Sequence, residues 1–399
     1  MCDVKIDSQP NLTNTVPNPF FNAFFAAPRT FLLNFITVLL FYSTSAFSQW
    51  DIIDAKTKVS MRGVHTVTPT ICWIGGSSGT VLRTTNGGKS WSAFKIPGAD
   101  SLDFRDIHAF SKETAIAMSA GPAELNKGKI YRTENGGDTW NLVYQTTQTG
   151  VFLDGIDFWN KNQGICLGDP INGRLFVLTT EDGGKSWKEL PMENRPEAQA
   201  GEACFAASGT SILAVGKDKA FIGTGGGKMA RVFRSDDMGR HWQVSETPMP
   251  AGPTSGIFGL HFWSKKHGIA VGGDYKNTSD TTRNVLLTED GGVTWKFGAT
   301  TKPFGLKEAV ALYHKRHSTW NGDGQIRSDD FALVAVGPSG SSSSTKQGKS
   351  WQSVGNEPFH AVSFAGNVGY AVGGSGLIAK IEKVSMKKKR KKLVFVREE

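Results

Sequence analysis

The stretch Thr84-Thr85-Asn86-Gly87-Gly88-Lys89-Ser90-Trp91 decides the fold of this chain, because its pattern returns along the sequence. The pattern, Ser/Thr-x-Asp/Asn-x-Gly-x-x-Trp, occurs in five full copies, and a sixth copy has Lys346 in place of the acid. Consecutive copies lie 47 to 56 residues apart, measured between their tryptophans. Such a period is typical of one four-stranded propeller blade. The acid or amide and the tryptophan of the five full copies are Asn86, Trp91, Asn135, Trp140, Asp182, Trp187, Asp237, Trp242, Asp290 and Trp295.

The chemistry of this motif is that of a turn. In most copies the acid or amide is followed by Gly-Gly, and glycine adopts the positive φ angles that a tight hairpin needs. The carboxylate or amide oxygen can accept backbone N–H groups inside the turn. The tryptophan then opens the next strand and packs against the blade. Because the same residues return in every repeat, they indicate a scaffold rather than a catalytic or metal-binding site.

Three further strand patterns precede each copy of the motif, so that a blade consists of strands a, b and c, the motif turn, and strand d. A seventh a-b-c set, at 361–364, 369–373 and 377–381, has neither a motif nor a fourth strand. The segment 50–53 begins with a tryptophan, as a d strand does. We therefore predict an all-β, seven-bladed propeller over residues 49–382, with four-stranded antiparallel blades and a ring closed by the N-terminal strand.

The repeat resembles that of the Asp-box (BNR) propellers, and it is most similar to the branch that contains the photosystem II stability and assembly factors and their bacterial relatives. The resemblance covers about residues 50–382 and implies a propeller that is more distantly related to the sialidases. The sequence departs from the sialidases, because it has no Arg-Ile-Pro strand like the one that opens their arginine triad. It also has room for one propeller, whereas xyloglucanases use two.

Residues 1–48 are predicted to be an N-terminal extension and a signal peptide. Arg29 precedes the apolar run 31–41, and Ala46-Phe47-Ser48 offers small residues at the two positions that a signal peptidase inspects. The run is short for a membrane span, although a retained membrane anchor is the alternative interpretation. We expect cleavage after Ser48, a secreted or periplasmic protein, and no stable membrane span after cleavage.

The positive charge is concentrated at the C-terminal end. The formal net charge is +9, and the tail 383–399 carries eight Lys/Arg and two Glu. The rest of the chain is only slightly basic and has no basic stripe interleaved with aromatic residues, so we expect no nucleic-acid partner. The tail is interpreted as a basic, disordered terminus.

No motif in the sequence predicts a cofactor or a metal ion. The segment 223–228 is Gly-rich, but Met229 follows where a phosphate-binding loop has Ser or Thr. The segment 321–325 has some character of a calcium loop but no Glu at the required distance. The three cysteines after the signal are interpreted as buried core residues, and their odd number argues against a disulfide framework. The alternative is that one pair forms a disulfide in an oxidising compartment.

Charged residues are expected to gather at one end of the central channel. Strand polarity puts the start of strand a and the b–c turns on a top face and the motif turns on the bottom face. An aligned column at the start of strand a consists of Arg62, Arg105, Asp154, Gly201, Phe258, Glu308 and His360. Charged residues of this column combine with Asp169 and Asp274 from the b–c turns and with Arg231 from strand c. The predicted ligand- or partner-binding site therefore consists of Arg62, Arg105, Asp154, Asp169, Arg231, Asp274 and Glu308. The alternative is a set of solvated salt bridges.

These features predict an exported, non-catalytic binding or assembly-type propeller that recognises a protein or glycan partner through its top face. The alternative is a sialidase-like glycoside hydrolase that acts on a glycan. Such an enzyme would need a convergent cluster of arginines with Tyr/Glu or paired acids. The sequence offers Arg62, Arg105 and Arg231 but no recognisable catalytic motif.

Overall fold

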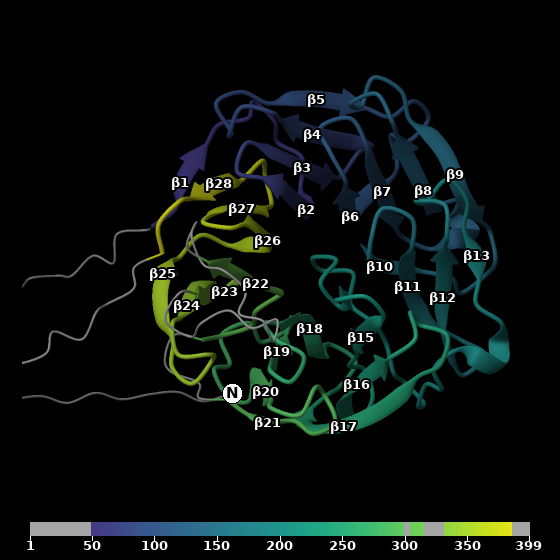
Figure 1. Cartoon of the computed structure of the whole chain (residues 1–399), viewed down its shortest axis with the longest axis vertical. Coiled ribbons are helices and arrows are strands. Elements are labelled where there is room, and N and C mark those ends of the chain that lie inside the picture. The colour runs from purple at the N-terminus through teal and green to yellow at the C-terminus, as the bar shows by residue number, and fades with distance from the viewer. Residues whose placement is uncertain (1–48, 299–303, 315–330, 385–399) are drawn as a thin grey trace, which may run out of the picture. The chain divides into compact units, whose positions relative to one another are not determined.

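The repeats form seven antiparallel sheets of four strands within the described part of the chain, and these sheets stand around a common axis as propeller blades (Figure 1). The computed structural model describes residues 49–298, 304–314 and 331–384. The first strand of each blade lies nearest the axis and the fourth lies at the rim. The predicted all-β, seven-bladed fold is confirmed.

Blades one to three follow the predicted order, with a short 3-10 helix in blade two. Their elements are β2 (Met61–Thr68), β3 (Ile71–Gly76), β4 (Thr80–Thr84), β5 (Ser92–Lys95), β6 (Asp103–Ala109), β7 (Ala115–Ala120), η1 (Ala123–Leu125), β8 (Gly128–Thr133), β9 (Asn141–Thr146), β10 (Leu153–Phe158), β11 (Gly164–Ile171), β12 (Arg174–Thr180) and β13 (Lys188–Glu189).

Blades four to six repeat this order after a second 3-10 helix. Their elements are η2 (Met192–Asn194), β14 (Ile212–Val215), β15 (Lys219–Gly223), β16 (Met229–Ser235), β17 (Gln243–Pro250), β18 (Ser255–Phe262), β19 (Gly268–Asp274), β20 (Val285–Thr288), β21 (Lys296–Phe297), β22 (Ala309–His314), β23 (Phe331–Gly337), β24 (Gly340–Ser344) and β25 (Gln352–Gly355).

Blade seven joins the two ends of the propeller. Its strands are β26 (Phe359–Ala365), β27 (Val368–Gly373), β28 (Ile378–Ile381) and the N-terminal β1 (Asp51–Ile53), which pairs antiparallel with β28. The indole of Trp50 is 4% exposed, donates from Nε1 to Ser341 Oγ (2.8 Å) and packs on Phe359. The N-terminal strand therefore closes the ring, as predicted, and leaves no open sheet edge at this point.

The hydrophobic core lies between neighbouring blades. One cluster joins Ile116 and Ile130 of blade two to Ile156 and Trp187 of blade three, and all four side chains are buried. The second glycine of the Asp-box turn fits this interface, because a Cβ on Gly184 would lie 2.5 Å from Cδ1 of Ile116. The Asp-box turn therefore contributes to blade packing as well as to the hairpin.

A buried carboxylate also connects two blades. Asp106 in β6 is 6% exposed, and its Oδ1 accepts the N–H of Ile107 (2.8 Å). Its Oδ2 accepts the N–H of Ile156 in β10 of the next blade (2.7 Å). Burial raises the pKa of Asp106 to about 8, although the two hydrogen bonds oppose this rise. The same carboxylate touches Gly209, where a Cβ would lie 2.2 Å from it.

The Asp-box acid is the hydrogen-bond acceptor of its turn. Oδ1 of Asp182 accepts the N–H groups of Lys185 and Ser186, both at 3.0 Å, and the Thr180 hydroxyl at 2.8 Å. Although burial opposes it, hydrogen bonding from Ser186 and its neighbours lowers the pKa of Asp182 to about 2. In the sixth copy Lys346 stands at this position, so this turn lacks a side-chain acceptor of that kind.

We expect Lys346→Asp to stabilise the protein by about 1 kcal/mol, because the new carboxylate can accept the N–H groups of the sixth turn. The melting temperature should rise by about 1–2 °C, measured by calorimetry. Lys346→Ala is the matched control, since it removes the charge without adding an acceptor. Equal melting temperatures for the Asp and Ala variants would show that the acid contributes nothing to this turn.

Candidate functional site

A β-bulge presents one side chain from each of five blades at the mouth of the channel. In β2, Arg62 is the extra residue between Met61, which pairs with Gly76, and Gly63, which pairs with Gly75. A bulge takes its extra residue out of the ladder and redirects the side chain. The same irregularity occurs in four other first strands, at Arg105, Asp154, Phe258 and His360.

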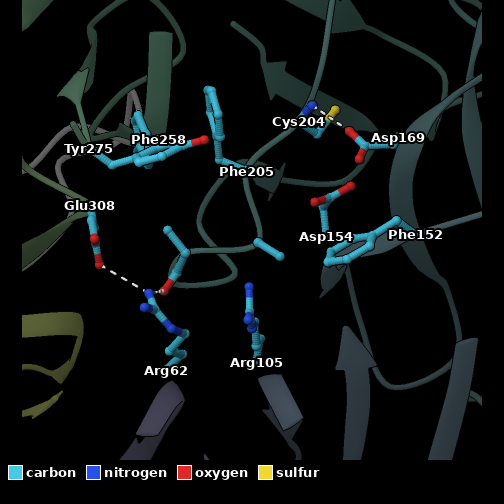
Figure 2. Close-up of a pocket in the computed structure, with 12 residues that line it drawn as sticks. Arg62, Arg105, Phe152, Asp154, Asp169, Cys204, Phe205, Phe258, Tyr275 and Glu308 are labelled. Atoms are coloured by element: carbon cyan, nitrogen blue, oxygen red, sulfur yellow. Dashed lines mark hydrogen bonds and ion pairs between the residues drawn. The ribbon is translucent and has the colours of Figure 1, made fainter. Parts of the chain in front are cut away.

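Four of these side chains, all except His360, line a pocket of about 380 Å³ with their neighbours, and we call it the mouth pocket (Figure 2). Five of the seven predicted site residues lie in its wall: Arg62, Arg105, Asp154, Asp169 and Glu308. The other lining residues are Phe152, Cys204, Phe205, Ala206, Ala207, Phe258 and Tyr275. The pocket thus combines two arginines, three acids and several aromatic rings from different blades.

Residues 205–210, which we call the channel loop, precede the first strand of blade four and contact several other blades. The carbonyl of Ala207 accepts a hydrogen bond from Arg62 Nη1 (3.3 Å), and the Ser208 hydroxyl donates to the Glu308 carbonyl (2.8 Å). The carbonyl of Thr210 accepts the N–H of Leu260 in blade five (2.9 Å). The loop therefore supports the mouth pocket from within the ring.

One side of the mouth pocket is an ion-paired cluster. The Glu308 carboxylate is 8% exposed and accepts from His360 Nδ1 (2.6 Å) and from Arg62 Nη1 (3.4 Å). Burial lowers the pKa of Arg62, and the charge of Glu308 opposes this effect. The Nη1 group of Arg62 is therefore engaged by Glu308, by His360 and by the channel loop.

Arg105 is more available to a ligand than Arg62. Within the described residues, its guanidinium makes one hydrogen bond, from Nε to Asp103 Oδ2 (2.8 Å). Figure 2 shows the end of the side chain directed into the mouth pocket. Its two Nη groups can thus offer a paired donor to a carboxylate, which is the geometry that arginine recognises best.

Aromatic rings form the opposite wall. Phe205 of the channel loop and Phe258 of β18 stack with centroids 4.1 Å apart and planes 4° apart. Tyr275, 46% exposed, meets Phe205 at 6.4 Å, edge to face (Figure 2). This wall can accept an apolar side chain or a flat ring a short distance from Arg105.

The third side of the mouth pocket, the acidic corner, consists of Asp154, Asp169 and Cys204. Asp169 Oδ1 accepts the backbone N–H of Cys204 (2.8 Å), and Asp154 is 1% exposed. Burial raises the pKa of Asp169 to about 6. Burial, followed by the charge of Asp169, raises the pKa of Asp154 well above its usual range. Asp154 is therefore not a solvated charge at the channel entrance, as the alignment suggested, but a buried carboxyl group.

Two predicted site residues are not in the mouth pocket. Arg231 is 6% exposed and donates from Nε to Glu202 Oε1 (3.0 Å) and from Nη2 to the Glu197 carbonyl (2.8 Å). It forms a buried ion pair within blade four. Asp274 ends β19 and accepts the N–H of Lys276 (2.8 Å), so its carboxylate organises a turn.

The alignment of the first strands does not hold in blade four. Gly201 lies beside the backbone of Gly226 and does not line the mouth pocket, because the first strand of this blade begins only at Ile212. Sequence reasoning missed Phe205 and Cys204 for the same reason. The segment 202–211 has no strand alternation that would have shown which side chains face the channel.

All three cysteines within the described residues are free and buried. No helix in the described part is both long and apolar enough to cross a bilayer. The predicted signal peptide and its cleavage after Ser48 lie outside the described residues, as does most of the basic tail.

No family profile matches the chain. A curated relative, the photosystem II assembly lipoprotein Ycf48 of Synechococcus sp. (strain CC9902), is 24% identical over 237 residues. This match spans 58% of the chain and 59% of the relative, so the chain matches about three-fifths of that protein's length.

Two solved structures share the fold over nearly their whole length. A structure of YCF48 bound to a D1 peptide has a TM-score of 0.55 and 12% identity, and the match covers 85% of this chain and 96% of that one. YCF48 from Cyanidioschyzon merolae has a TM-score of 0.57 and 14% identity, with 84% and 98% covered. Taken together, the sequence and fold comparisons show distant homology to the Ycf48 assembly factors.

Proposed function

We propose that this distant homologue of the Ycf48 assembly factors is an exported, non-catalytic binding propeller that holds a peptide segment of a partner protein in its mouth pocket. The observation that carries the proposal is the pairing of the available Arg105 guanidinium with the stacked rings of Phe205 and Phe258 in one pocket. A peptide can supply both a carboxylate and an apolar side chain to such a pocket.

The comparisons support a protein partner rather than a glycan. One similar structure contains a D1 peptide, and that match covers 85% of this chain. The curated relative is a lipoprotein, which supports export. The identity of the partner does not follow from these similarities, because the sequence identity is low and the curated match is partial.

A sialidase-like hydrolase has less support from the described residues. The structure brings Arg62 and Arg105 to one pocket, whereas Arg231 is ion-paired with Glu202 in blade four. The two closest acids, Asp154 and Asp169, come from the same blade, and Asp154 is too buried to reach a sugar. This arrangement provides neither an arginine triad nor two acids on opposite sides of a glycosidic bond.

The proposal can be tested with a phage-displayed library of random peptides selected on the purified full chain. We expect the enriched peptides to share a carboxylate next to an apolar or aromatic side chain. Arg105→Gln should weaken their binding, measured by fluorescence anisotropy, by about ten- to a hundredfold, because a charge-assisted hydrogen bond is lost.

Arg240→Gln is the matched control, since Arg240 is an exposed arginine in the Asp-box turn of blade four. It should bind the selected peptides as the unchanged protein does. Failure to enrich any peptide, or equal binding by the Arg105 variant, would contradict the proposal. Binding on a glycan array that depends on Phe258 would favour a glycan ligand instead.

A further inference from the structure

The acidic corner has a feature that the peptide proposal does not use. Asp154 Oδ2 is fully buried and has no hydrogen-bond partner among the described residues. A buried carboxylate oxygen without a partner is costly and calls for an explanation. In Figure 2 the carboxylate of Asp154 points toward Asp169 and Cys204.

The donor atoms of the corner are close enough to share one ion. One carboxylate oxygen of Asp154, one of Asp169 and the Cys204 Sγ all lie within 4.8 Å of one another. Tetrahedral zinc binds oxygen at about 2.0–2.2 Å and thiolate at about 2.3 Å, which places its ligands about 3–4 Å apart. Side-chain adjustments of about an ångström would therefore complete the site.

We propose that Asp154, Asp169 and Cys204 form a zinc-binding site in the wall of the mouth pocket. A thiolate with two carboxylates suits zinc, whereas calcium and magnesium select oxygen ligands. The fourth coordination position faces the mouth pocket, because all three residues line it, and water can occupy it. The proposal does not depend on peptide binding.

The surroundings of the corner hold two of its ligands in place. The Cys204 N–H donates to Asp169 Oδ1 and leaves the second oxygen of Asp169 for the ion. The Ala206 backbone hydrogen-bonds to Asp154. Such outer contacts commonly orient metal ligands. The three ligands carry a charge of −3 when deprotonated, and burial disfavours this charge unless a cation or protons neutralise it.

Zinc would tie the segment before the channel loop to blade three. Cys204 directly precedes the loop, whereas Asp154 and Asp169 belong to β10 and β11. An ion shared by these residues would fix the loop against the blade by three bonds. We therefore expect zinc to raise the melting temperature of the full chain, by an amount that grows with the logarithm of the ratio of the free zinc concentration to the Kd.

The test uses Zn²⁺ and Co²⁺ as probes with the purified, metal-free full chain. We expect one equivalent of Zn²⁺ to bind in calorimetry, and one equivalent of Co²⁺ to give a thiolate-to-cobalt charge-transfer band. Cys204→Ser should abolish the band, and Asp154→Asn should weaken binding by at least about tenfold. Cys72→Ser is the matched control, because Cys72 is a free, buried cysteine in blade one, and it should leave the band unchanged.

Two results would overturn the proposal: absence of Zn²⁺ binding by the unchanged chain, or a cobalt band that persists in Cys204→Ser. The first would show that the acidic corner holds no zinc ion. If the variants do not fold, thiol alkylation of the unchanged chain decides the question. Zn²⁺ should then slow the modification of Cys204, mapped by mass spectrometry, and leave Cys72 and Cys166 unaffected.

Discussion

Trp50→Ala is expected to destabilise the propeller by about 3–5 kcal/mol, measured by urea denaturation of the full chain. The indole is buried, packs on Phe359 of blade seven and donates to Ser341 of blade six, so its removal opens a cavity where the ring closes. The hydrogen bond from the indole to Ser341 is also lost, although the Ser341 hydroxyl keeps the Gly355 carbonyl as its acceptor (3.3 Å).

Ile52→Ala provides the matched control, since Ile52 lies in β1, two residues after Trp50, and is 56% exposed. It should change the free energy of unfolding by no more than about 0.5 kcal/mol. Similar losses in the two variants would show that β1 acts as a strand without a specific role for the indole. Trp50→Ala should also promote association in light scattering, because loosening β1 exposes the edge of β28.

Asp106→Ala is expected to cost about 2–4 kcal/mol, because the N–H groups of Ile107 and Ile156 would remain buried without an acceptor. The second of these bonds joins blades two and three. Asp100→Ala is the control, since Asp100 is exposed, and it should melt like the unchanged protein. A cost below about 1 kcal/mol for Asp106→Ala would mean that water replaces the carboxylate.

Asp106 also predicts a pH dependence. Its pKa is raised from 3.8 to about 8 in the folded chain, so the folded state keeps a proton that the unfolded state releases. The stability linked to this proton is fully present below about pH 4 and is lost as the pH rises toward 8. The stability advantage of the unchanged protein over Asp106→Asn should therefore shrink between pH 5 and pH 8. A constant difference would show that Asp106 is ionised throughout.

The sequence alone was sufficient for the fold because the Asp-box turn is local chemistry repeated at a fixed period. The acid, the glycine with positive φ and the tryptophan of an Asp box lie within a few residues of one another. Each copy can therefore be recognised from the local sequence, and each copy identifies one blade. The seventh a-b-c set lacks a fourth strand of its own, and the segment that begins with Trp50 starts as a d strand does. Together they predicted the ring closure in which β1 pairs with β28. None of these inferences required knowledge of distant contacts.

The candidate site was predictable only where the first strands of the blades could be aligned. Arg62 and Arg105 stand two residues before the first apolar position of their strands, at the β-bulge, and lie in the mouth pocket. Arg231 and Asp274 are also near strand ends, but the Arg231 side chain donates to Glu202, and the Asp274 carboxylate accepts a backbone N–H within its own turn. Backbone position alone does not show which partner a charged side chain will choose. Phe205 and Cys204 occupy an irregular segment, where no period indicates side-chain direction.

The closure of the ring by β1 also sets an order of events in folding. Asp51 pairs with Lys380, near the opposite end of the described chain, so blade seven cannot be completed until nearly all of that chain has been synthesised. Contacts between residues so far apart in sequence form late and slow the folding of β proteins. Blades one to six can assemble from local hairpins beforehand. The last kinetic step is then the docking of β1, and until it occurs β28 has an unpaired edge available to a second molecule.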